Sequence, residues 1–412
     1  PFESTSKAKL VDPSKTGEAA EVTTLEVPKQ GTYTIDDNGV VTFTPLPTFT
    51  GEATAVSIVR KDKNGTPATA TYTPKVVGVT PTSENANSEG IQGATQEGTP
   101  TFTAGKANIG TEENPVEKTV PITISATNPA KFVVDGQPVE ETTIPAKEGD
   151  KQVGTYTIEP TTGKVTFTPN KDYHGTPTPV TVQAKDDNGT PATATYTPVV
   201  KEAVPSGDSQ VSSGIQGAVQ TATPVFTPGK NTVNGQDVSV PFEPTSKAKL
   251  IDPSKTGEEA EVTTLVVENQ GTYTIDDNGV VTFTPLPTFK GEATEVSIVR
   301  KDKNGTPATA KYKPTVVGVT PSATEATSTK EQGATQEVTV SFTPGKATIG
   351  TAEKSVPMDP TAYKLLGGQD GKTPLDTVPA MSEDGTKEVG TYTIKVVEGK
   401  PVVTFTPTDK TY

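Results

Sequence analysis

Short stretches in which apolar and polar residues alternate recur along this chain in a fixed order. In residues 154–158 (GTYTI) the apolar Tyr156 alternates with threonines, and in residues 165–169 (VTFTP) Phe167 does the same. Alternation with a period of two predicts β-strands that have one apolar face and one hydroxyl-bearing face. The two stretches together predict a β-hairpin.

The same two stretches occur four times, which indicates a tandem array. GTYTI also begins at Gly31, Gly271 and Gly390, and VTFTP also begins at Val41, Val281 and Val403. The GTYTI copies are spaced at intervals of 117 to 123 residues. A fixed order of segments at a regular interval is typical of repeat proteins, so we expect four copies of one domain.

A second predicted hairpin follows the first. It joins residues 56–59 to residues 68–73 through a turn that contains Asn64 and Gly65, and the stretch NGTPATA recurs at Asn188 and Asn304. Alternate residues again form an apolar face on the return strand. Prolines at 74, 198 and 314 follow this strand, and because proline lacks an N–H we expect them to prevent a neighbouring strand from pairing there.

Stretches rich in Pro, Ser and Asn mark the predicted domain boundaries. We predict a partial repeat at 1–82 that lacks its opening segment, complete repeats at 83–205 and 206–322, and a partial repeat at 323–412 that lacks its final hairpin. Residues 1–82 return almost unchanged at 241–322. Between the opening segment and GTYTI, the stretches Lys131–Val134 and Val262–Val267 are predicted to be strands of the second sheet.

The bulk composition fits this prediction and narrows the class of protein. The chain has 412 residues, no cysteine, 31% hydrophobic residues, 37 glycines and 38 prolines. A repeat of this length can fold alone, and its low apolar content predicts a thin core. The predicted fold class is all-β, with tandem β-sandwich domains, Ig-like or related, arranged end to end as an elongated rod.

Charge and hydropathy exclude two kinds of partner. The net charge of −14 argues against nucleic-acid binding, which needs a basic surface. No stretch is apolar for the roughly 18 residues of a membrane helix, so no membrane insertion is expected. Because the sequence ends inside a repeat at Tyr412, we interpret it as a fragment that carries neither leader nor anchor.

Candidate chemistry is sparse, and we predict no catalytic residue, no metal site and no cofactor. His174 is the sole histidine and has no counterpart in the other copies, so a solvated loop residue is expected. The oxygen-rich stretches 36–39 and 186–189 raise the question of calcium, but their spacing differs from an EF-hand loop and a structural turn is the preferred interpretation. Intramolecular isopeptide bonds between lysine and asparagine stay open.

The ordered set of motifs resembles the CshA-type fibril repeat of Gram-positive cell-surface adhesins. The set comprises a QGA opening (Gln92–Ala94, Gln216–Ala218, Gln332–Ala334), GTYTI, VTFTP and NGTPATA, and it spans nearly the whole chain. The resemblance implies a secreted, wall-anchored fibrillar stalk with a separate adhesive region, which this sequence lacks.

We therefore predict a non-enzymatic structural stalk at the cell surface, extracellular and attached to the cell wall, which projects a distal binding region. Its only required partners are neighbouring repeats of the same chain, and host surface proteins would bind through the distal region. The alternative is that the repeats themselves bind a host matrix protein or glycan by strand addition. A spacer within a large surface enzyme is a third possibility.

Overall fold

The computed structural model describes residues 6–111 and 113–412, and these form an all-β protein. The residues Pro1, Phe2 and Glu3, with which the first predicted repeat begins, lie outside the described part. Two compact units are present, the first made of Pro1–Ala203 with Lys230–Val240 and the second of Val204–Gly229 with Pro241–Tyr412. Each unit is described by itself, and the strands are grouped by predicted repeat.

The strands of the first two predicted repeats lie in the first unit. The first repeat contains β1 (Lys9–Val11), β2 (Glu21–Val22), β3 (Thr24–Val27), β4 (Gly31–Ile35), β5 (Val41–Pro45), β6 (Gly51–Glu52), β7 (Val56–Lys61), β8 (Pro67–Tyr72) and β9 (Lys75–Val76), with a 3-10 turn at Gly17–Ala20. The second contains β10 (Thr82–Glu84), β11 (Ala86–Ile91), β12 (Gln96–Gly98), β13 (Thr101–Thr103), β14 (Gly105–Asn108), β15 (Glu117–Val120), β16 (Lys131–Val134), β17 (Gln137–Pro138), β18 (Thr143–Glu148), β19 (Lys151–Glu159), β20 (Lys164–Pro169), β21 (Val180–Lys185) and β22 (Pro191–Lys201).

The third and fourth predicted repeats follow the same order. The third contains β23 (Ser206–Gly207), β24 (Gln210–Ile215), β25 (Gln220–Ala222), β26 (Phe226–Thr227), β27 (Gly229–Val233), β28 (Gln236–Val240), β29 (Lys249–Ile251), β30 (Glu261–Val262), β31 (Thr264–Val267), β32 (Gly271–Ile275), β33 (Val281–Pro285), β34 (Gly291–Glu292), β35 (Val296–Lys301) and β36 (Pro307–Val317), with a 3-10 turn at Gly257–Ala260. The fourth contains β37 (Ser322–Thr324), β38 (Gln336–Thr339), β39 (Ser341–Thr343), β40 (Gly345–Ile349), β41 (Ala352–Val356), β42 (Leu365–Gly367), β43 (Thr373–Leu375), β44 (Thr377–Met381), β45 (Glu388–Val397) and β46 (Lys400–Pro407).

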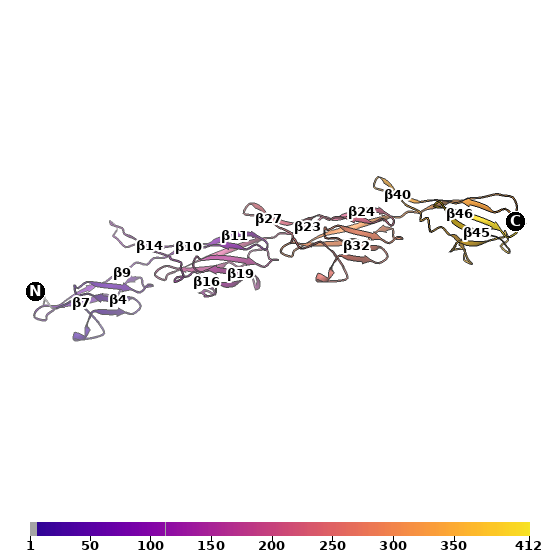
Figure 1. The fold of residues 1–412 in the computed structure, drawn as a ribbon. Coiled ribbons are helices and arrows are strands. Elements are labelled where there is room, and N and C mark those ends of the chain that lie inside the picture. The colour runs from indigo at the N-terminus through magenta and orange to yellow at the C-terminus, as the bar shows by residue number, and fades with distance from the viewer. Residues whose placement is uncertain (1–5, 112) are drawn as a thin grey trace. The chain divides into compact units, whose positions relative to one another are not determined.

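The second repeat is a two-layered sandwich, with β11, β16 and β19 gathered in one body (Figure 1). One sheet has the order β11-β22-β21-β16-β17 and the other the order β12-β20-β19-β18. Apolar residues from both sheets fill the space between them, including Tyr156, Phe167, Val182 and Tyr196. The third repeat has the same pair of sheets and an equivalent core around Tyr273 and Phe283.

Both predicted hairpins are confirmed. Tyr156 lies opposite Phe167 across β19 and β20, and their ring centroids are 5.2 Å apart. The Tyr156 hydroxyl donates a hydrogen bond to the Thr178 carbonyl at 3.0 Å, so the polar end of a buried ring is satisfied. Tyr33 and Tyr273 make the equivalent bonds to Thr54 and Thr294.

The variable middle segment divides between the two sheets, which corrects part of the prediction. Lys131–Val134 pairs with β21 in the second sheet, as predicted. In the third repeat Val262 pairs with β29 in the second sheet, as predicted, but Thr264–Val267 pairs with β32 and so belongs to the GTYTI sheet. The prediction for this strand was wrong because both sheets bury one apolar face, and alternation does not reveal which sheet a strand joins.

A separate two-stranded hairpin follows the opening segment in three repeats. The pairs are β14 with β15, β27 with β28, and β40 with β41, and they join neither layer of a sandwich. The labels β14, β27 and β40 in Figure 1 mark these hairpins outside the layers.

A substitution at Gly154 would test how closely the two strands of the first hairpin pack. A Cβ there would lie 2.4 Å from the Thr168 carbonyl oxygen, a backbone atom that cannot move aside. We expect Gly154→Ala to destabilise the second repeat by about 1 to 3 kcal/mol, the usual cost of overpacking. Hydrogen exchange of β19 and β20 in the full chain measures this, and Thr155→Ala on the same strand is the control. Equal exchange in the two variants would contradict the expectation.

Asp12 provides a pH-dependent contact in the first repeat. Hydrogen bonds from the Ser14 hydroxyl and backbone N–H, together with Lys15, lower the pKa of Asp12 to about 2. Because this pKa is depressed, the contact contributes stability above the ordinary aspartate pKa of 3.8 and loses it as the pH falls through about 2. An NMR titration of the Asp12 carboxyl should show that midpoint, and Asp12→Asn should remove the associated change at the Ser14 amide.

Candidate functional site: the closing segment of each repeat

The opening segment closes the sandwich by joining both of its sheets. In the second repeat β11 pairs in parallel with β22, from Ala86 opposite Tyr196 to Ile91 opposite Lys201. A few residues later, β12 pairs antiparallel with β20 in the other sheet. One segment therefore covers an edge of each layer.

A hydrogen-bonded group of three side chains fixes this closure. Ser88 Oγ donates to Gln96 Oε1 at 2.7 Å and lies 2.7 Å from the Tyr196 hydroxyl. Because a serine has one hydroxyl proton, the tyrosine is the donor to Ser88. Gln96 Nε2 donates to the Val199 carbonyl at 3.0 Å. Burial raises the pKa of Tyr196, so its hydroxyl keeps its proton at neutral pH.

The third repeat contains the same group, formed by Ser212, Gln220 and Tyr312. In the fourth repeat, Ser328 donates to Gln336 at 2.7 Å. In the described part of the first repeat β8 is an edge strand, and Tyr72 is 39% exposed, whereas Tyr196 and Tyr312 are fully buried. The opening segment thus accounts for the burial of this tyrosine.

The prolines on the return strand do not prevent pairing, contrary to the sequence-based expectation. Ser88 lies opposite Pro198 and Ser212 opposite Pro314 in the parallel ladders. Val200 exchanges both backbone hydrogen bonds with Gly175, whereas the Lys201 carbonyl accepts from the Gln92 N–H. Residues of even number on β22 therefore face away from β11. The missing N–H of Pro198 lies on that other side and costs the parallel ladder nothing.

The glutamine of the QGA stretch holds the exit of the repeat. Gln92 Oε1 accepts from the Ala203 N–H at 3.1 Å, and Gln92 Nε2 donates to the Lys171 carbonyl at 3.3 Å. Gln216 makes the equivalent bonds to Val319 and Pro287. The opening of each repeat therefore fixes the backbone by which the chain leaves it.

The residues weighed as chemical candidates take up structural positions. His174 is half exposed, and its Nε2 lies 3.6 Å from Glu202 Oε1. Asp36 Oδ1 accepts backbone N–H groups from Asn38 and Val40, and Asp186 Oδ1 does so from Asn188 and Thr190, so both stretches are turns. In the pairs Asn38-Gly39 and Asn188-Gly189 only the glycine has a positive φ.

The structure brings none of these candidates together. Among the described residues no group of three or more His, Asp or Glu side chains could hold a metal ion. None of the described lysines is buried, although a buried lysine is the condition for an isopeptide bond. The described part of the chain contains no helix with the length and apolarity of a membrane span.

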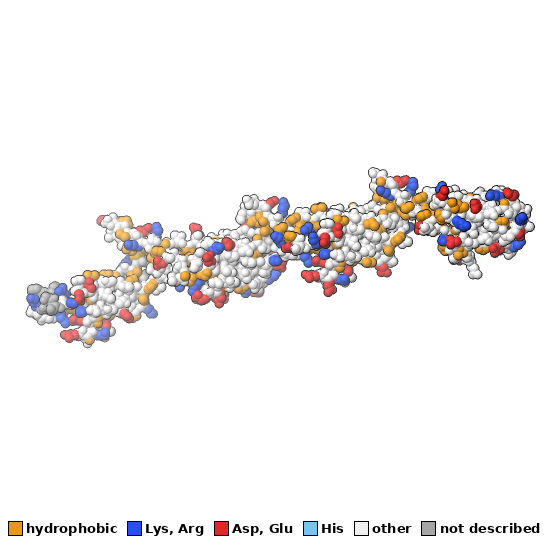
Figure 2. Space-filling model, in the orientation of Figure 1, with side chains coloured by type: hydrophobic (Ala, Val, Ile, Leu, Met, Phe, Trp, Pro, Cys, Tyr) orange, Lys and Arg blue, Asp and Glu red, His pale blue; other side chains and the backbone are white. Residues whose placement is uncertain are grey.

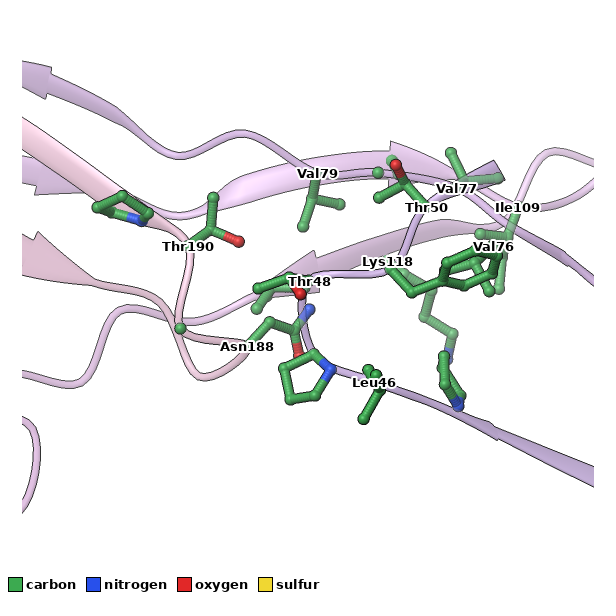
Figure 3. A pocket seen from close by; sticks show the side chains of 18 residues that line it. Leu46, Thr48, Thr50, Val76, Val77, Val79, Ile109, Lys118, Asn188 and Thr190 are labelled. Carbon is green, nitrogen blue, oxygen red and sulfur yellow. The ribbon is translucent and has the colours of Figure 1, made fainter. Parts of the chain in front are cut away.

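A hollow of about 420 Å³ lies in the first unit (Figure 3). Leu46, Val77 and Val79 of the first repeat and Ile109 of the β14–β15 hairpin supply apolar side chains, and Lys118 is the one ionisable residue that lines it. The lining of this hollow contains no nucleophilic side chain paired with a basic side chain. The equivalent hairpin β27–β28 packs against Ile91 and Ala94 of an opening segment.

The surface has no field of a single charge sign on the face seen in Figure 2, where acidic and basic side chains are interspersed. Much of that face consists of uncharged polar side chains and backbone. Exposed ion pairs such as Lys106 with Glu117 and Lys346 with Glu353 add little stability.

Comparison with known families decides the relationship of this chain. The family model described as "Surface adhesin CshA repetitive domain" matches residues 1–76, 78–200, 202–316 and 318–412. The chain belongs to this family. Its four CshA repeats thus place it among surface adhesins, with an extracellular location. The opening segment lies within each of the matched ranges from the second onward.

Solved structures of other tandem domain arrays are similar at low identity. The eight N-terminal Ig domains of DSCAM align over 98% of this chain and 60% of theirs, with 10% identity and a TM-score of 0.21. Cadherin domains 1–4 of protocadherin gamma B7 align over 98% and 85%, with 10% identity and a TM-score of 0.27. The I9–I11 tandem of titin aligns over 76% and 89%, with 9% identity and a TM-score of 0.26. No curated protein matches the CshA-repeat chain.

A substitution at Ser88 would test the hydrogen-bonded group of Ser88, Gln96 and Tyr196 in the second CshA repeat. In Ser88→Ala, Gln96 Oε1 loses its donor and the Tyr196 hydroxyl loses its acceptor, which should cost about 1 to 3 kcal/mol. We expect faster hydrogen exchange in β11 and β12 with little change in β19. Thr95→Ala, an exposed change in the same segment, is the control. Unchanged exchange in β11 would mean that the group does not hold the segment.

Proposed function

We propose that this chain is part of the stalk of a fibrillar adhesin, in which tandem repeats hold a separate binding region away from the cell wall. The observation that carries the proposal is the way in which the opening segment closes the sandwich. It is built in the same way in the second and third repeats, and its buried polar side chains bind the repeat's own backbone. Such a design reproduces one module many times and adds length.

The exit bonds support the same role. Gln92 holds Ala203 and Gln216 holds Val319, so the last residues of the second and third repeats are fixed to the body of their own repeat. We propose an end-to-end arrangement of the repeats and a Gram-positive wall anchor beyond this sequence. Small-angle scattering of the purified chain tests the arrangement.

A non-enzymatic role is part of this proposal. The family is one of adhesins, and the hollow at the β14–β15 hairpin has a single ionisable side chain in its lining. Asp36 and Asp186 stabilise turns. The repeats would act through their dimensions and their stability.

One recurring feature favours the alternative that the repeats bind a ligand themselves. A groove of about 440, 420 and 570 Å³ lies at the same place in the first, second and third repeats, beside the edge strands β3, β18 and β31. An extended peptide would fit beside such an edge. Against this, Pro145 interrupts the edge of β18 and Glu26 places a charge on that of β3, which are common ways to discourage strand addition.

A cell-surface assay separates the two functions. A known binding domain and a wall anchor are joined either directly or through this chain, and attachment of the cells to a ligand-coated surface is measured. The stalk proposal predicts stronger attachment with the chain present and the same affinity of the purified binding domain for its ligand.

The controls use the chain alone. Cells that display it without the binding domain should not attach, and the purified chain should show no saturable binding to matrix proteins or glycans. Attachment by the chain alone would support the alternative, and equal attachment with and without the chain would overturn the stalk proposal.

A further inference from the structure

The hairpin β27–β28 comes from the third repeat but packs against the second. Residues Lys230–Val240 belong to the first compact unit, whereas the residues on either side belong to the second unit. Val240 is only 5% exposed and forms an apolar cluster with Ile91 and Ala203, joined by Val233, Val238 and Ala94. This cluster is separate from the sandwich cores.

Polar contacts hold the same hairpin in place. Asn231 Nδ2 donates to the Glu202 carbonyl at 2.9 Å, and the Asn234 N–H donates to Glu89 Oε2 at 3.2 Å. Glu89 Oε1 also lies 3.2 Å from Lys201 Nζ. Glu89 and Ile91 lie on β11, and Ala203 follows β22, so the hairpin rests on the closing segment and on the exit of the second repeat.

The second unit repeats this arrangement. The hairpin β40–β41 of the fourth repeat contacts β24, the closing strand of the third repeat. Ile349 and Val356 stand where Val233 and Val240 stand in the hairpin before it, and Ile109 and Val120 stand there in β14–β15. Two of the three apolar positions of the hairpin are therefore apolar in all three copies, whereas Val238 corresponds to Lys118 and Lys354.

We propose that this hairpin is a clasp that each repeat contributes to the repeat before it, so that a repeat is completed by residues encoded in its neighbour. The docking surface consists of the QGA turn, the end of β11 and the exit segment, and the partner that fits it is the hairpin of the following repeat. A lone two-stranded hairpin is marginally stable in water, so the clasp folds only on this surface.

The clasp couples the stabilities of successive repeats. In a linear array, the total stability is approximately a sum of the stability of each repeat and the interaction with its nearest neighbours. Here that interaction is carried by the clasp, and it acts on the preceding repeat. The coupling concerns the folding of the array and holds whether or not the array carries an adhesive region.

A substitution in the clasp should therefore loosen the repeat before it. In the full chain, Val240→Ser removes an apolar contact, and we expect about tenfold faster hydrogen exchange in residues 86–94 and 199–203 of the second repeat. Exchange in β32 and β33 of the third repeat should stay unchanged. Val211→Ser, at a valine that is 80% exposed in the third repeat, is the matched control.

The reciprocal variant changes the docking surface. Ala94→Glu places a charge in the apolar cluster, and exchange in residues 230–240 should rise by a similar factor, because a coupling between two elements acts in both directions. Thr95→Glu, at the exposed neighbouring position, is its control. The proposal is overturned if Val240→Ser leaves the second repeat unchanged or loosens the third repeat instead, or if Ala94→Glu leaves the hairpin unchanged.

Discussion

The parallel pairing of the opening strand with the return strand is the interaction on which the rest of this structure depends. It buries the tyrosine of the return strand, and it brings Ser88 and Gln96 into hydrogen-bonding distance of one another and of that tyrosine. It also places Gln92 at the exit of the repeat. Without it, as in the first repeat of this sequence, the side chains of β8 are exposed.

The same pairing explains why the chain can be long without large cores. The apolar content is low, at 31% of residues, so each repeat relies on a thin layer between two sheets. Polar side chains then complete the edges, where apolar residues would be exposed to water. The clasp adds to this, because one small apolar cluster contains residues of two adjacent repeats. Membership of a surface adhesin family agrees with such a modular, extendable fold.

The sequence predicts the two hairpins well because their signals are local. Alternation in 154–158 and 165–169 gives the strands, and a glycine with positive φ gives each turn. The resemblance to the CshA-type repeat is likewise confirmed by the family match. The domain boundaries stay a prediction, since the hairpin Lys230–Val240 packs with a different unit from the residues that flank it.

The closing site is harder to predict, because its parts are far apart in the sequence. From the sequence alone, Pro198 indicates the end of a β-ladder. Only the structure shows that the backbone N–H position of residue 198 faces away from β11, so that the proline does not disturb the parallel pairing. Ser88 and Tyr196 are separated by 108 residues, and no local pattern joins them. The repetition of Ser, Gln and Tyr at matching places in two repeats was the one available signal.

The parallel ladder also has a mechanical consequence. Ala86 begins the first of these two strands and Lys201 ends the second, and the six paired positions lie between them. Traction on a repeat from its two ends pulls the strands past each other along their length, so the bonds of the ladder are loaded in shear and share the force. A hairpin pulled from its open end would instead break one bond at a time. Each closed repeat is thus arranged to resist stretching between its first and last strands.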